Sequence, residues 1–215
     1  MIISLGRQYV FVHIPKTGGT SLALALEQRA MKDDIMLGDT PKARRRRRRV
    51  DASLARGRLW KHSTLGDIDG LIARDVLGGL YAFTMVRNPW DRMVSYYHWL
   101  RQSRFRHVAV KLAHSLSFGD FATHPRICQS FRDHPAASYM QRADGGEQCN
   151  AYIRLEHFEQ DAVGLADHLG FDLTVPLSNT SDRDADYRRY YTDRTADSIA
   201  ECCAADIARF GYCFE

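Results

Sequence analysis

The residues best able to do chemistry lie near the amino end, in the segment Phe11-Val-His-Ile-Pro-Lys-Thr-Gly-Gly-Thr-Ser21. Lys16 brings a positive charge, and Gly18 and Gly19 let an anion approach the backbone closely. An apolar run precedes the glycines and a helix is expected to begin just after them, so free backbone N–H groups would face the anion. The segment also carries three hydroxyl groups, those of Thr17, Thr20 and Ser21. It is therefore predicted to hold a phosphate.

The position of the glycines separates this segment from the phosphate loop of kinases. A Walker A loop, Gly-x-x-x-x-Gly-Lys-Ser/Thr, would need glycines at positions 10 and 15. The chain has Val10 and Pro15 there, and its glycines follow Lys16 instead. A P-loop kinase acting with ATP and Mg²⁺ is kept as an alternative. So is a plain glycine-rich turn with an incidental surface lysine.

A second apolar run, Leu80–Val86, leads directly into Arg87-Asn-Pro-Trp-Asp-Arg-Met-Val-Ser95. Arg87 stands where a kinase commonly has an Asp that helps to hold Mg²⁺. Its guanidinium is always charged and donates in pairs, which suits an anion. Ser95 lies two helical turns beyond Pro89 and is expected to share a phosphate with Arg87. A surface salt bridge is the alternative for Arg87.

The two segments resemble motifs of one enzyme family. Pro15-Lys-Thr-Gly-Gly-Thr-Ser-Leu22 resembles the 5′-phosphosulfate-binding loop of sulfotransferases, which use 3′-phosphoadenosine 5′-phosphosulfate (PAPS), and Arg87-Asn-Pro-x-Asp-Arg-x-x-Ser95 resembles their 3′-phosphate-binding motif. Segments 153–170 and 187–212 look like the corresponding segments of family 2 sulfotransferases. This group includes membrane-bound enzymes that sulfate animal glycosaminoglycans, and it also includes compact bacterial relatives of those enzymes. The resemblance implies that PAPS is bound by Lys16, Thr17, Gly18, Gly19, Thr20, Ser21, Arg87 and Ser95. Residues 31–58 and 103–150 match least.

Sulfuryl transfer requires a base for the acceptor hydroxyl and a positive charge for the leaving phosphate. Lys16 and the loop amides can meet that charge, so no metal is expected. Histidine is the usual base for an alcohol acceptor. His62 is the predicted base, because Leu59-Trp-Lys-His-Ser-Thr-Leu65 is expected to form a strand that ends beside the loop. A histidine in a hydrogen-bonded turn is the alternative.

Other candidates rank below His62. His13 is expected to pack or to orient the end of its strand, and Glu156 would be tested as the base if the acceptor were a phenol. Structural or distal positions are expected for His98, His157 and His168. In the polar segment Ser178–Arg183, Asn179 or Arg183 is expected to touch the nucleotide, although a plain surface loop is the simpler interpretation.

Strand and helix signals alternate along the chain. Strands are expected at 8–14, 80–86 and 151–156, and helices at 19–30, 65–76, 89–102, 158–169 and 193–209, with short helices near 106–123. This alternation indicates an α/β fold: one P-loop-like domain over residues 1–215, with a central parallel sheet flanked by helices. Cys202 and Cys203 are expected in the core, and Gly211 is placed to end the last helix.

Composition fits one enzyme domain of 215 residues, 45% of them hydrophobic. The chain contains no apolar run of membrane-spanning length and no signal peptide pattern. The five cysteines show neither a disulfide framework nor a zinc pattern, which indicates a cytoplasmic protein.

Six consecutive arginines, Arg44–Arg49, lie in a segment predicted to be a flexible basic loop, residues 44–58. The run accounts for the net charge of +4. It is either a solvated loop or an arm that attracts a polyanionic acceptor. Nucleic acid is not the expected partner, because stacking aromatic residues are absent around the run.

These observations predict a PAPS-dependent sulfotransferase that acts on an acceptor hydroxyl, carried by a glycan or a glycolipid. A catalytically inactive nucleotide- or glycan-binding module is the third possibility, beside the kinase.

Overall fold

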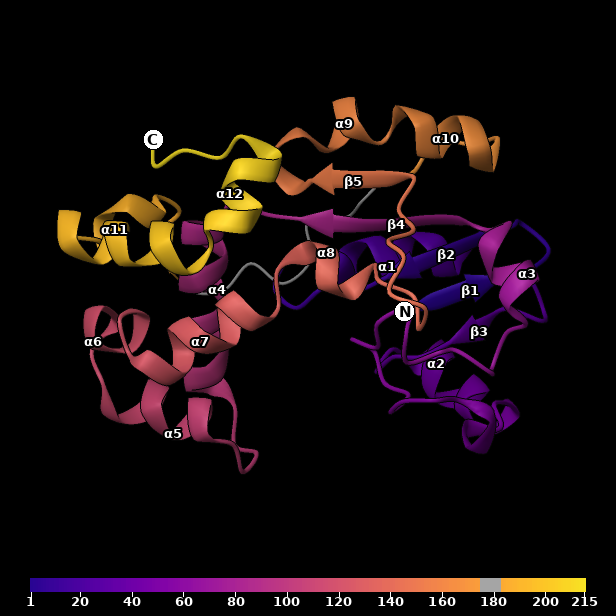
Figure 1. Ribbon diagram of the computed structural model, residues 1–215, viewed down its shortest axis with the longest axis horizontal. Helices are drawn as coiled ribbons and strands as arrows, with labels where there is room; N and C mark the ends of the chain where they lie inside the picture. Colours follow the sequence, from indigo (N-terminus) through magenta and orange to yellow (C-terminus); the bar gives the residue numbers. More distant parts are fainter. Residues whose placement is uncertain (175–182) are drawn as a thin grey trace. The chain divides into compact units, whose positions relative to one another are not determined.

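The computed structural model describes residues 1–174 and 183–215 (Figure 1). These residues form two compact units. The first contains Met1–Val86 and the described residues from Ala136 to 174, and the second contains Arg87–Pro135 and residues 183–215. The expectation that 1–215 is a single domain stays a prediction. Asn179 lies outside the described residues.

The first unit is built on a five-stranded sheet of order β3-β1-β2-β4-β5. The strands are β1 (Ile2–Ser4), β2 (Tyr9–Val12), β3 (Ile35–Met36), β4 (Tyr81–Val86) and β5 (Ala151–Arg154). β2, β4 and β5 are mutually parallel, which confirms the predicted α/β core. β1 is antiparallel to both β2 and β3, so the sheet is mixed rather than wholly parallel. A turn of four residues joins β1 to β2, and a connection this short permits only antiparallel pairing.

The parallel strands bring their carboxyl ends to one edge of the sheet. Val12 pairs with Thr84, and Thr84 pairs with Tyr152. The buried Thr84 hydroxyl also donates to the Val12 carbonyl oxygen at 2.7 Å. The glycine segment leaves β2 at this edge, which is the position expected for a ligand loop in an α/β fold.

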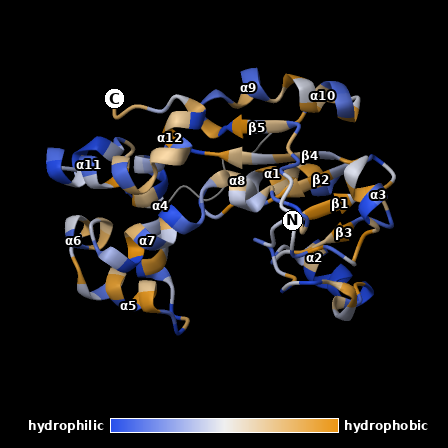
Figure 2. Cartoon of the chain, viewed as in Figure 1, coloured by the Kyte–Doolittle hydropathy of each residue, from blue (hydrophilic) through white to orange (hydrophobic). Residues whose placement is uncertain are grey.

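Helices cover the sheet of the first unit. They are α1 (Gly19–Gln28), α3 (Arg74–Gly78), α8 (Ala136–Tyr139), α9 (Phe158–Asp161) and α10 (Val163–Leu169). Leu22 and Leu26 of α1, together with Leu165 of α10, share a buried cluster with strand residues such as Phe11 and Phe83. Figure 2 shows the strands of the sheet mostly in hydrophobic colours. Burial on both faces explains the continuous apolar runs of β2 and β4.

Two predicted elements of this unit are wrong. The helix expected at 65–76 is mostly turn, and only α3, which begins at Arg74, is helical. Gly70 takes a left-handed φ of 87°, which interrupts a helix. Thr64 and Asp67 bond to each other's backbone N–H groups through their side chains, which favours a turn over a helix. The strand expected within Leu59–Leu65 is likewise a turn.

The basic segment 44–58 is partly helical, which corrects the prediction of a loop. It includes the second half of α2 (Pro41–Arg46), together with the short 3-10 helices η1 (Arg47–Arg49) and η2 (Ala52–Leu54). The Thr40 side chain accepts from the Ala43 N–H, and Pro41 occupies the first turn, so the helix has a well-formed start. Arginine is also a good helix former.

The second unit is helical. Its elements are α4 (Pro89–Gln102), α5 (Val108–Ser115), α6 (Phe118–Ala122), α7 (Pro125–Asp133), η4 (Tyr187–Tyr190), α11 (Asp193–Cys202) and α12 (Ala204–Phe210). Helix α4 has the predicted bounds. The helix expected at 193–209 is broken at Cys203, and Gly211 ends α12 with a φ of 68°, as predicted.

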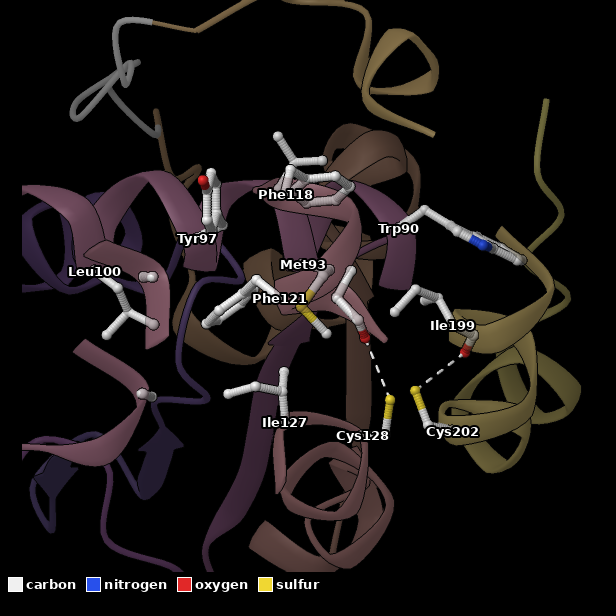
Figure 3. Close-up of a cluster of buried hydrophobic side chains, with 14 of the residues drawn as sticks. Trp90, Met93, Tyr97, Leu100, Phe118, Phe121, Ile127, Cys128, Ile199 and Cys202 are labelled. Atoms are coloured by element: carbon white, nitrogen blue, oxygen red, sulfur yellow. Dashed lines mark hydrogen bonds between the residues drawn. The ribbon is translucent and has the colours of Figure 1, made fainter. Parts of the chain in front are cut away.

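Aromatic and aliphatic side chains from α4, α6, α7 and α11 form the core of this unit (Figure 3). Cys128 and Cys202 lie in it and donate to the carbonyl oxygens of Ala122 and Ile199, at 3.2 and 3.7 Å. Cys202 and Cys203 are 3% and 6% exposed, which confirms their predicted place in the core.

Among the described residues, no helix combines the length and the apolar character that a membrane span requires.

Candidate functional site

The segment between β2 and α1 has the backbone of an anion-binding loop. Lys16 has a φ of 66° and Gly18 a φ of 84°, so two positions out of three are left-handed. Such turns direct successive N–H groups to one side and form a concave surface for an anion. Lys16 is not a glycine, and holding it in this conformation costs roughly 1–2 kcal/mol. Residues held at such a conformational cost cluster at functional sites.

Both glycines are required by their surroundings. A Cβ on Gly18 would lie 2.8 Å from Leu155 Cδ1, and the left-handed φ already disfavours any other residue. A Cβ on Gly19 would lie 2.3 Å from Cδ2 of His13. The absence of both side chains therefore lets the loop pack tightly on Leu155, which directly follows β5, and on His13.

Helix α1 begins at Gly19, the start predicted for the helix at 19–30. Its N-cap is Gly18, which makes no side-chain cap bond, so the positive end of the helix faces the loop. Thr20 is exposed at this end and Ser21 is buried.

Thr17 differs from the other hydroxyl residues. It is 1% exposed, and its hydroxyl donates to the Ile14 carbonyl oxygen at 2.9 Å. The Thr17 hydroxyl proton is therefore committed to the loop itself. Its side chain shapes the loop, and its backbone N–H remains the group suited to an anion.

His13 links the loop to the candidate base. Its ring lies against Gly19 and its centroid is 4.6 Å from that of His62. The side chain is buried, and this burial lowers its pKa well below the ordinary histidine range, with His62 as a further cause. His13 is thus a neutral packing residue, consistent with its predicted orienting role.

His62 lies with Nδ1 2.7 Å from the His13 carbonyl oxygen. A carbonyl oxygen only accepts, so Nδ1 carries the proton and Nε2 of the neutral ring has a free lone pair. Burial lowers the pKa of His62 to about 3, partly opposed by the bond to the His13 carbonyl. The ring is therefore neutral at physiological pH, in the tautomer that a general base needs.

The His62 turn is held from within by Ser63. The Ser63 hydroxyl is fully buried, accepts from the Trp60 N–H at 2.9 Å and donates to the Arg58 carbonyl oxygen at 2.9 Å. Because these bonds close a turn, the segment pairs with no strand of the described sheet. The turn, which the sequence analysis kept only as an alternative, still presents His62 beside the loop.

The second unit contains Arg87 and Ser95, the residues predicted to bind the 3′-phosphate. Arg87 donates to Oδ2 of Asp91 from Nε at 2.9 Å and from one terminal nitrogen at 2.5 Å. Arg183 pairs with Oδ1 of the same carboxylate at 2.7 Å. The three side chains are 12–17% exposed. One carboxylate thus holds two guanidinium groups, and the cluster keeps a net positive charge.

Ser95 is buried on α4, four residues after Asp91 and therefore on the same helix face. Arg87, Asp91 and Ser95 are thus spaced four residues apart along this segment. Asn88 caps the helix by accepting from the Trp90 N–H, and Pro89 occupies its first turn as predicted.

Asp91 was not among the predicted site residues, although its spacing from Arg87 carried the signal. An acid four residues after an arginine is within reach of an ion pair. Arg183 was predicted only weakly, and the structure gives it a specific partner. The surface salt bridge considered for Arg87 exists, but with a largely buried partner.

Two further histidines make contacts within their own units. His168 approaches the Arg7 and Gln8 carbonyl oxygens at 3.1 Å, at the opposite sheet edge from the loop. His98 packs its ring against Tyr190, with centroids 5.2 Å apart. Glu156 is exposed and directly follows Leu155, which contacts the loop at Gly18, so it stays the second candidate base.

A cavity of about 320 Å³ in the first unit does not belong to this site. Its lining includes Leu80, Tyr81 and Asn150, at the amino ends of β4 and β5. The loop lies at the carboxyl ends of the parallel strands.

Comparison with known proteins gives one extensive match. The sequence model of a family described as the sulfotransferase family, Sulfotransfer_2, matches residues 1–207. No curated protein sequence is significantly similar to the chain. Among solved structures, the chain is similar to the mouse sulfotransferase SULT7A1 complexed with PAP, with 16% sequence identity and a TM-score of 0.48. That similarity covers 95% of this chain and 85% of the mouse chain.

Proposed function

Because the chain belongs to the sulfotransferase family, we propose that it transfers a sulfuryl group from PAPS to a hydroxyl group of a carbohydrate acceptor. The observation that carries the proposal is the left-handed loop at Lys16 and Gly18, which opens onto the uncapped start of α1. The family match confirms the sulfotransferase prediction and sets the kinase alternative aside.

Lys16, the backbone N–H groups from Thr17 to Thr20, and the Thr20 and Ser21 hydroxyls are proposed to hold the 5′-phosphosulfate. When bound, PAPS supplies a sulfuryl group attached to a phosphate that leaves. Lys16 and the loop N–H groups stabilise the negative charge that develops on that phosphate. No metal ion is expected to take part, and a chelator should leave activity unchanged.

His62 is proposed to act as the general base. Its Nε2 lone pair accepts the proton of the acceptor hydroxyl, while Nδ1 stays bonded to the His13 carbonyl oxygen. The bond fixes the ring and the tautomer before the acceptor arrives. His13 supports this position through its ring contact and its backbone oxygen.

Arg87 and Ser95 are proposed to bind the 3′-phosphate, with Arg183 as a further donor. Arg183 Nη1 is buried and has no hydrogen-bond partner among the described residues. An unsatisfied buried N–H of a cation is costly, and a phosphate oxygen would satisfy it. Asp91 keeps both guanidinium groups in place.

Calorimetry with 3′-phosphoadenosine 5′-phosphate (PAP) and adenosine 5′-phosphate tests this assignment. The protein should bind PAP much more tightly, and Arg87→Ala should remove most of the difference. Loss of a charged hydrogen-bond partner costs about 1.5–3 kcal/mol, or roughly 10- to 100-fold in affinity. Arg101→Ala, an exposed arginine at the end of the same helix, is the matched control.

Equal affinity of the unmodified protein for both nucleotides would overturn the assignment of the 3′-phosphate. Transfer from labelled PAPS to glycans, phenols and small alcohols then tests the acceptor class. Nucleotide binding without transfer to any acceptor would favour the inactive module instead. A cytoplasmic location, expected from the cysteine content, stays a prediction.

A further inference from the structure

Trp60 is a large aromatic side chain that the fold holds at the surface. It is 43% exposed, although it belongs to the turn fixed by the fully buried Ser63. The Ser63 N–H donates to the Trp60 carbonyl oxygen at 3.2 Å, so both backbone groups of Trp60 are bonded to Ser63. The indole is therefore presented from an ordered backbone.

The surroundings of Trp60 combine an apolar surface with positive charge beside the candidate base. The His62 ring is perpendicular to the indole, with centroids 4.9 Å apart. The exposed Arg58 guanidinium lies over the indole, 5.4 Å from its centroid. An indole next to a neutral imidazole and a solvent-exposed cation can recognise a ligand that is apolar on one face and anionic at its rim.

Lys61 adds a second cation to this turn. Its Nζ pairs with Asp39 at 2.7 Å, and this bond lowers the pKa of Asp39. Arg44 lowers the pKa of Asp39 further by its charge. Because Asp39 balances Lys61, the cation that favours an anionic partner beside Trp60 is Arg58.

We propose that Trp60 and Arg58 form an acceptor platform: Trp60 packs against the apolar face of a saccharide ring, and Arg58 pairs with a carboxylate or sulfate on the same chain. This inference rests on the proposed function, because it takes His62 as the base. A saccharide ring packed on the exposed indole lies close to His62, because the indole itself contacts the His62 ring. The platform therefore selects which hydroxyl reaches Nε2.

The test uses the whole protein loaded with PAP. A uronic-acid-containing oligosaccharide and its carboxyl-reduced form are titrated into it by calorimetry. The unmodified protein should bind the acidic form more tightly. Trp60→Ala should weaken binding of both forms by about tenfold or more, which corresponds to roughly 1.4 kcal/mol. Arg58→Ala should remove the preference for the acidic form.

Controls separate recognition from folding. Trp99→Ala, a tryptophan of the second unit that is 36% exposed, should change neither affinity. Trp60→Phe keeps an aromatic surface and should retain most of the oligosaccharide binding. PAP affinity and the thermal melting temperature, measured for each variant, should equal those of the unmodified protein.

The platform is overturned if Trp60→Ala binds the oligosaccharide as the unmodified protein does, or if a phenol is the ligand that loses affinity. Equal binding of the acidic and reduced forms by the unmodified protein overturns the role of Arg58. Sulfuryl transfer to a saccharide with unchanged KM in Trp60→Ala refutes the platform while the proposed function stands. Trp60-dependent oligosaccharide binding without transfer from PAPS refutes the proposed function instead.

Discussion

At the scale of single residues, Lys16 has a backbone conformation that favours glycine and a charge that glycine lacks. A φ of 66° suits glycine, so the fold alone would favour glycine at this position. The lysine is therefore kept at a conformational cost, as expected for a group that meets charge in a transition state.

Lys16→Gly and Lys16→Ala should both lower turnover far more than PAP affinity, because both remove the charge. Lys16→Gly should be the more stable of the two by about 1 kcal/mol, or roughly 2–4 °C in melting temperature. Steady-state kinetics, calorimetry and thermal melting provide the three measurements. Full turnover in Lys16→Gly would mean that the loop needs only its backbone.

The environment of His62 determines an unusual pH profile. Burial disfavours the imidazolium, so the pKa falls to about 3 and the neutral base persists far below pH 6.5. Protonation of His62 should therefore cause no fall in the kcat/KM of the unmodified protein between pH 8 and pH 5. Activity that depends on neutral His62 is lost only as the pH falls toward 3.

His62→Ala should lose about 10²–10⁴ in rate while PAP affinity stays unchanged. His114→Ala, an exposed histidine, is the control. An acid limb near pH 6.5 that disappears in His62→Ala would contradict the effect of burial. Full activity in His62→Ala would move the role of base to His13 or Glu156.

At the scale of elements, the sequence predicted those whose signal is local. The apolar runs of β2 and β4 and the Asn88-Pro89 start of α4 determine their own structure, and the structure confirms them. The edge strand β3 and its neighbour β1 have only two and three residues, too short for a periodic pattern. They depend on pairing with each other, which no local window contains.

The candidate site shows the same division. The glycine loop could be predicted because its residues are consecutive. At His62 the local pattern favoured a strand over the turn that forms, because the turn depends on a buried Ser63 hydroxyl that competes with strand pairing. The pair of Asp91 and Arg183 joins residues far apart in the chain, so only the spacing of Arg87 and Asp91 gave a sequence signal.

At the scale of the whole molecule, the distribution of charge determines how an acidic acceptor would arrive. The net charge is +4, and six arginines are consecutive. Two of them are structural: Arg46 donates to the Met31 carbonyl oxygen at 2.6 Å, and Arg49 to that of Lys32 at 3.2 Å. The other four are exposed: Arg44, Arg45, Arg47 and Arg48.

Replacing these four exposed arginines with serine, and keeping Arg46 and Arg49, changes the net charge from +4 to 0 without removing a bond to the 31–34 turn. The KM for an acidic oligosaccharide should rise and lose most of its salt dependence, because salt screens long-range attraction over about 8 Å at physiological ionic strength. PAP affinity and melting temperature should stay unchanged. A matched variant replaces four exposed cations of the second unit with serine, namely Arg104, Arg106, Lys111 and Arg126. If both variants raise KM equally, only net charge matters; if neither does, the arginine run is a solvated surface with no part in acceptor capture.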